Sequence, residues 1–209
     1  MCAHTPPPSD PAAVTLANEI MKRLDALDIT ITNARGFRAL LEDLHGRDLS
    51  GVKDPHISAI HMVRAGVLRA AIGTVMAAVD KRGTDRASIG QIVHMLDGLD
   101  LSVIAYRWPD PAFGPAELQC AKDDWAALVA SSDFQACKDF RDGVVGHTLV
   151  LALPKVPNEA YFRVHDAAEN IIRRFYRMCG YGKPSFPDHQ PNLIATAKVF
   201  WDTYFKGMT

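Results

Sequence analysis

Apolar residues recur along this chain at intervals of three and four positions, and this periodicity restricts its fold more than any other feature. Such a spacing places side chains on one face of an α-helix, whereas a half-buried β-strand alternates at every second residue. The first clear stripe comprises Val14, Ala17, Ile20, Met21, Leu24 and Leu27. Only residues 99–106 show a competing strand-like pattern. We therefore predict an all-α fold.

Proline, glycine and short polar residues mark where the predicted helices begin and end. The helices are expected to begin near residues 10, 32, 54, 88, 116, 131, 158 and 192, and the last one ends near residue 206. The helix that opens at Asp54 is predicted to be the longest, and its small residues would let other helices approach closely. These are Ala65, Gly66, Ala70, Ala71, Gly73, Ala77 and Ala78. We expect an antiparallel helical bundle with short extra helices.

The size and charge of the chain limit its classes of function. Its 209 residues suit a single domain over residues 10–209, preceded by a flexible, proline-containing leader at residues 1–9. A net charge of -1 gives no overall attraction to nucleic acid or to an anionic membrane, so a polyanion would need a local basic patch. We see no run of 18 apolar residues and no signal peptide, and we expect no membrane span.

The four cysteines are scattered along the chain, without the close pairs of a metal or redox motif. They are Cys2, Cys120, Cys137 and Cys179. The last three occupy apolar-compatible positions of predicted helices, so we expect reduced residues in or near the core of a cytoplasmic protein.

One short segment of a late helix concentrates polar chemistry. Arg141 and Asp142 are followed after four further residues by His147, and Gly143 and Gly146 lie between them. On a straight helix Arg141 and His147 would be about 120° apart around the axis and about 9 Å apart along it. A second copy of the helix would complete such a site more naturally than one copy, which argues for a symmetric homodimer with this segment at its axis.

These side chains suit the cleavage of RNA without a metal ion. A histidine acts as general acid or base near neutral pH, and a guanidinium holds a phosphate and stabilises the additional charge of a pentacovalent phosphorane. The 2′-hydroxyl of the RNA would then attack the neighbouring phosphate. No other part of the sequence offers a competing nucleophile arrangement.

The Arg-Asp-x4-His pattern resembles the signature of the HEPN superfamily (higher eukaryotes and prokaryotes nucleotide-binding domain), and the layout resembles its AbiU2-like, abortive-infection branch. The resemblance covers residues 10–206, although only Arg141, Asp142 and His147 form a motif. It implies a bundle that dimerises through the motif helices and, in many members, endoribonuclease activity. Arg141 and His147 would be the catalytic pair and Asp142 the orienting residue, whereas other members are non-catalytic scaffolds.

A basic run near the end of the penultimate helix is a candidate contact for RNA. It consists of Arg173, Arg174 and Arg177, to which we add Lys138 beside the motif. These cations would bind phosphate, with neighbouring tyrosines available for base stacking. The alternative is a solvated helix face favoured by the helix dipole.

Two further pairs of titratable residues admit structural interpretations. Glu42 and His45 have the Glu-x-x-His spacing of di-iron bundles, but such centres need two copies, so we expect no metal and no cofactor. His165 and Glu169 are four residues apart and are expected to form an exposed helix contact.

Two functions from different classes follow from the sequence. The first is a homodimeric, metal-independent endoribonuclease acting as a toxin or phage-defence effector. The alternative is a non-catalytic helical bundle that binds a partner protein, such as an antitoxin or toxin component, or a nucleotide. The near-zero net charge favours the second, because RNA-binding proteins usually carry a basic stripe.

Overall fold

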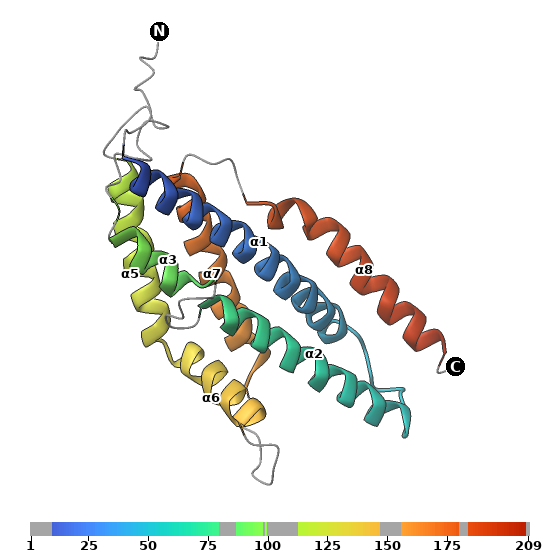
Figure 1. Ribbon diagram of the computed structural model, residues 1–209. Helices are drawn as coiled ribbons and strands as arrows, with labels where there is room; N and C mark the ends of the chain where they lie inside the picture. The colour runs from blue at the N-terminus through green and yellow to red at the C-terminus, as the bar shows by residue number, and fades with distance from the viewer. Residues whose placement is uncertain are drawn as a thin grey trace.

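The computed structural model describes residues 10–79, 87–97, 99, 113–146, 156–179 and 184–207, and all regular structure in these ranges is α-helical (Figure 1). The helices are α1 (Pro11–His45), α2 (His56–Val79), α3 (Ile89–Asp97), α5 (Phe113–Ala130), α6 (Ser132–Gly146), α7 (Asn158–Met178) and α8 (Phe186–Lys206). The predicted all-α helical bundle is confirmed. The predicted leader, residues 1–9, lies outside the described residues.

Helix α7 occupies the centre of the bundle. It packs against α1, α2, α3, α5 and α6, whereas α8 packs against the opposite side of α1 (Figure 1). The side chains of Tyr161, Phe175 and Ile171 on α7 are fully buried. The Tyr161 hydroxyl donates a hydrogen bond of 2.8 Å to the carbonyl oxygen of Ala34, which satisfies its polar group inside the core.

Helix α1 is one continuous helix, so the predicted interruption near Thr32 is wrong. The Thr30 hydroxyl donates a hydrogen bond of 2.9 Å to the carbonyl oxygen of Ala26, in the preceding turn of the same helix. Ile31 and Ala34 are fully buried. A threonine in a helix costs only a few tenths of a kcal/mol more than alanine, whereas burial of an isoleucine contributes about 1.5–3 kcal/mol. Packing therefore outweighs local propensity, and α1 rather than α2 is the longest described helix.

The start of α8 also differs from the expectation, because the helix begins at Phe186 and not near residue 192. The carboxylate of Asp28 on α1 accepts hydrogen bonds from the backbone N–H groups of Ser185 at 2.8 Å and Phe186 at 3.2 Å. These contacts satisfy donors that have no partner within a helix. A cap supplied from α1 therefore lets α8 start early, before Pro191, which lies in the helix interior.

Three predicted helix starts carry the expected side-chain caps. Asp10 accepts from the backbone N–H of Ala12 at 3.0 Å, Ser88 from Gln91 at 3.2 Å, and Ser131 from Phe134 at 3.1 Å. Helix α5 begins at Phe113, three residues before the expected start. A proline in the first turn of a helix, as at Pro115, loses no intrahelical hydrogen bond.

The first half of α2 is largely exposed, and its small residues meet the expectation of close helix approach only in part. Ala71 and Ala78 are fully buried, but the two glycines have no close neighbours. A Cβ atom added at Gly66 or Gly73 would meet no atom within 4 Å. By length and composition α2 also qualifies as a membrane-crossing helix, with a mean hydropathy of 1.5, a test that the core helix of a soluble protein can also pass. The expectation that no segment is apolar enough to span a membrane is therefore too strict.

None of the described cysteines forms a disulfide bond. Cys137 and Cys179 are buried, but Cys120 is exposed on α5, which corrects its predicted place in or near the core. Burial, reinforced by the nearby Asp133 carboxylate, raises the pKa of the Cys137 thiol to about 12. Cys2 lies outside the described residues.

Candidate functional site

The spacing of apolar residues along α6 determines which of its side chains face outward. Phe134, Cys137 and Phe140 are buried and fix the inner face of the helix. Arg141 and Asp142 follow this stripe, with side chains that are 20% and 48% exposed. Arg141 and Asp142 are therefore accessible to solvent while α6 is held against the core.

Asp142 holds two cations at the outer surface of α6. The Nε and Nη2 atoms of Arg141 lie 2.9 Å and 2.8 Å from Asp142 Oδ1, and Lys138 Nζ lies 3.1 Å from Asp142 Oδ2. The hydrogen bond from Arg141, followed by that from Lys138, lowers the pKa of the Asp142 carboxyl group below its ordinary value. Asp142 is therefore suited to orient Arg141 as a carboxylate, and not to exchange a proton near neutral pH.

The structure tests only part of the predicted catalytic set. Helix α6 continues without interruption through Gly143 and ends at Gly146. Gly143 therefore does not break the motif helix. His147, the predicted general acid and base, lies outside the described residues. Arg141, Asp142 and Lys138 are brought together, as their spacing on one helix requires.

The predicted RNA-contacting arginines lie far from this group. An ion pair of 2.6 Å between Arg163 Nε and Asp133 Oδ2 joins α7 to the start of α6, and Figure 1 shows that the two helices run in opposite directions. Arg141 and Arg173 extend away from this ion pair toward opposite ends of the bundle. At 1.5 Å per residue their separation along the helices is roughly 25–30 Å.

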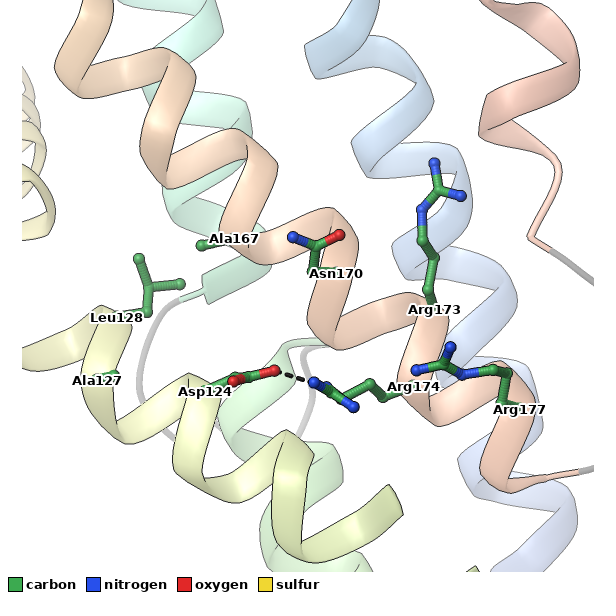
Figure 2. Close-up of a pocket in the computed structure, with 8 residues that line it drawn as sticks. All are labelled: Asp124, Ala127, Leu128, Ala167, Asn170, Arg173, Arg174 and Arg177. Carbon is green, nitrogen blue, oxygen red and sulfur yellow. Dashed lines mark hydrogen bonds and ion pairs between the residues drawn. The ribbon is translucent and has the colours of Figure 1, made fainter. Parts of the chain in front are cut away.

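The arginines of α7 line a pocket of about 420 Å³ between α5 and α7. Asn170, Arg173, Arg174 and Arg177 are spaced as one helical face, and Figure 2 shows them on the α7 side of the pocket. The remaining lining residues are Ala167 of α7 and Asp124, Ala127 and Leu128 of α5. The pocket therefore combines guanidinium groups with a small apolar surface.

Carboxylates of α5 position two of these arginines. Arg174 Nε lies 2.6 Å from Asp124 Oδ2, and Glu117 Oε2 lies 3.3 Å from Arg174 Nη1 and 3.0 Å from Arg177 Nη2 (Figure 2 shows the first contact). The hydrogen bond to Asp124 and then that to Glu117 raise the pKa of Arg174 further above its ordinary value. The ion pairs hold α5 against α7.

Arg173 is positioned by a different set of neighbours. Its guanidinium lies over the Phe186 ring at 5.0 Å from the centroid, and its Nη2 atom is 3.7 Å from Glu169 Oε2. The side chain of Arg173 is 42% exposed and that of Arg177 is 53% exposed, so both remain accessible to solvent.

His165 and Glu169 form a buried polar cluster, which contradicts the expected exposed contact. Both are buried, and Arg35 of α1 binds the two carboxylate oxygens of Glu169, with its Nε atom 2.6 Å from Oε1. His165 Nδ1 lies 3.6 Å from the same oxygen. Arg38 pairs with Asp166 on the rim of the cluster. The spacing of His165 and Glu169 gave no signal of burial, because Arg35 lies 134 residues away from Glu169 in the sequence.

The Glu42 and His45 pair shows no sign of a metal site. Glu42 Oε1 accepts a hydrogen bond of 2.7 Å from Arg38 Nε, and His45 is exposed at the last position of α1. Within the ranges that the structure describes, no group of three or more potential metal-ligating side chains lies together.

An apolar groove of about 520 Å³ lies between α2 and α8 over α1. Its lining includes Gly36 and Phe37 of α1, Thr74 of α2, and Leu193 and Phe200 of α8. None of the described residues that line it carries a charge. Charged side chains entering this groove would lose hydration without gaining an ionic partner.

The chain matches no protein-family model, and comparisons with curated proteins and with solved structures give no match.

Proposed function

We propose that the protein is a homodimeric, metal-independent endoribonuclease of the HEPN type that acts in the cytoplasm as a toxin or phage-defence effector. The observation that supports this proposal best is the accessible pair of Arg141 and Asp142 near the end of α6. The carboxylate holds the guanidinium close to the helix end, and His147 follows the last helical residue, Gly146, in the sequence.

The proposed reaction assigns one role to each residue. His147 removes the proton of the RNA 2′-hydroxyl, whose oxygen attacks the neighbouring phosphorus atom. The bond from phosphorus to the 5′-oxygen breaks, and this oxygen takes up a proton to leave a 5′-hydroxyl and a 2′,3′-cyclic phosphate. Arg141 stabilises the additional negative charge of the phosphorane, and Asp142 keeps Arg141 in position. Pairing of two α6 helices would bring a second His147 to supply the proton of the leaving group.

The decisive experiment is RNA cleavage in the presence of EDTA by the wild type and by His147→Ala. We expect the wild type alone to cleave and to leave 2′,3′-cyclic phosphate ends. His94→Ala is a matched control, because His94 is exposed on α3, away from the motif, and its loss should leave the rate unchanged. Wild-type rates in a folded His147→Ala variant would exclude the proposed mechanism.

The apolar groove supports a second candidate function, a non-catalytic module that binds a partner protein. Because its described lining is uncharged, the groove suits an uncharged face of a partner helix packed between α2 and α8. Phe200→Asp would introduce a charge into this groove and abolish binding of such a partner. In contrast, the same substitution should leave RNA cleavage by the α6 site intact.

A further inference from the structure

We propose that the pocket between α5 and α7 binds the phosphate group of a nucleotide, either within an RNA strand or free. The four polar donors Asn170, Arg173, Arg174 and Arg177 lie on one face of α7 and line the same cavity. The Arg174 guanidinium is turned toward Asp124, and that of Arg173 extends toward Phe186 at the edge of the cavity. Guanidinium groups bind phosphate through two parallel N–H···O contacts, which a single ammonium group cannot reproduce.

The ion pairs of the pocket prepare this site for an anion. Glu117 contacts both Arg174 and Arg177, and Asp124 contacts Arg174, so these guanidinium groups are held at the pocket wall before a ligand arrives. Ligand binding is weakened when long side chains must become ordered, and here the ion pairs order them before the ligand binds.

The balance of charge around Arg173 favours an anionic ligand. The Glu169 carboxylate that lies 3.7 Å from Arg173 is bound more closely by Arg35 of α1. Arg173 therefore shares its carboxylate with a second guanidinium group, that of Arg35. A phosphate beside Arg173 would compensate the positive charge that this shared carboxylate leaves unbalanced.

The apolar side of the pocket suits the sugar or base of the same ligand. Ala127, Leu128 and Ala167 line the cavity beside the donors. The volume of about 420 Å³ lies in the range typical of small-ligand sites, roughly 300–1,000 Å³. If these arginines only formed a solvated helix face, neither the concave shape nor the apolar surface would be required.

If the ligand is an RNA strand, the pocket is an anchoring subsite for the proposed nuclease, and this part of the inference rests on the proposed function. The roughly 25–30 Å between Arg173 and Arg141, estimated from the helical rise, places the anchor several nucleotides away from the scissile phosphate. Loss of the anchor would therefore weaken RNA binding without removing a group that contacts the reacting atoms.

The test is binding of a fluorescent 2′-O-methyl RNA oligonucleotide to the full chain, measured by anisotropy over a range of salt concentrations. This RNA lacks the 2′-hydroxyl nucleophile, so binding is measured whether or not the protein cleaves RNA. We expect Arg173→Gln and Arg177→Gln each to weaken binding about fivefold to tenfold, and to reduce the slope of log K against log salt by about 0.7. Circular dichroism confirms that each variant is folded.

Arg163→Gln is the matched control, because Arg163 is on the same helix and forms an ion pair outside the pocket. Its affinity should equal that of the wild type. Competition with AMP and with inorganic phosphate separates the two sources of phosphate. Displacement by AMP indicates a free nucleotide as ligand, whereas RNA binding that depends on Arg173 and resists AMP indicates a strand. The proposal is overturned if the wild type binds none of these probes, or if the Arg163 variant loses as much affinity as the pocket variants.

Discussion

Arg35 of α1 binds both carboxylate oxygens of Glu169 on α7, across 134 residues of sequence and inside the interface of the two helices. The side chains are only 11% and 6% exposed. Burial of a lone carboxylate is costly, so the two residues depend on each other more strongly than a surface ion pair does.

Replacement of Arg35 by alanine should therefore lower the free energy of unfolding by about 3–5 kcal/mol, because it leaves the buried Glu169 without its closest cation. The double variant Arg35→Met, Glu169→Leu should recover most of this loss. Arg163→Ala, at a pair whose arginine is 62% exposed, is the control and should cost less than about 1 kcal/mol. Urea unfolding measures all three, and equal losses for Arg35→Ala and Arg163→Ala would contradict the interpretation.

Asp28→Ala should loosen the start of α8 by removing the acceptor for the N–H groups of Ser185 and Phe186. Loss of a helix cap costs about 0.5–2 kcal/mol. Asp28→Asn keeps an acceptor oxygen and should be milder. Amide hydrogen exchange provides the measurement, with faster exchange expected in the first turns of α8. Unchanged protection there in Asp28→Ala would show that α8 is held by its packing alone.

The Arg35–Glu169 ion pair and the Asp28 cap of α8 are contacts that the sequence alone does not predict. Periodicity identifies the helical class, and the caps at Asp10, Ser88 and Ser131 are local patterns that the structure reproduces. The continuity of α1 and the start of α8 depend on contacts between distant segments. No local pattern places Arg35 beside Glu169 or Asp28 beside Ser185.

The candidate site likewise has contacts that the sequence predicts and contacts that it does not. The contacts of Arg141 with Asp142 and of Asp142 with Lys138 follow from spacing on a single helix. The run of Arg173, Arg174 and Arg177 is visible in the sequence, but the pocket is not, because its opposite wall comes from α5. Its carboxylate partners, Glu117 and Asp124, lie more than one helix away and carry no motif of their own.

The pH dependence of RNA cleavage should distinguish Asp142 from His147. Hydrogen bonding to Arg141 lowers the pKa of Asp142 below its ordinary value of 3.8, so the carboxylate persists as the pH falls until it passes below that value. Any loss of activity between pH 7 and pH 5 should thus come from His147, because histidine is the side chain whose ordinary pKa, about 6.5, lies in this range. Asp142→Asn should lower kcat without moving this limb of the kcat/KM profile, and a displaced limb would assign the titration to Asp142.

Alkylation by iodoacetamide should separate the described cysteines. Cys137 is buried and its thiol pKa is raised to about 12, so at pH 8 it should resist reaction in the folded protein. Cys120 is exposed and should react readily. Peptide mapping by mass spectrometry provides the measurement, and the same reaction in urea should label both. Rapid labelling of Cys137 under native conditions would show that α6 opens from the core.

Gly66→Ala should stabilise the protein by about 0.5–1 kcal/mol, because the residue is helical and an added Cβ meets no neighbouring atom within 4 Å. Gly73→Ala should behave similarly for the same reason. The measurement is the thermal unfolding temperature of each variant relative to the wild type, in dilute solution and at high protein concentration. A gain at both concentrations places the α2 glycines on a face without close contacts. A gain in dilute solution that turns into a loss at high concentration would show that a second copy packs against this face, since only close helix approach makes an added methyl group unfavourable.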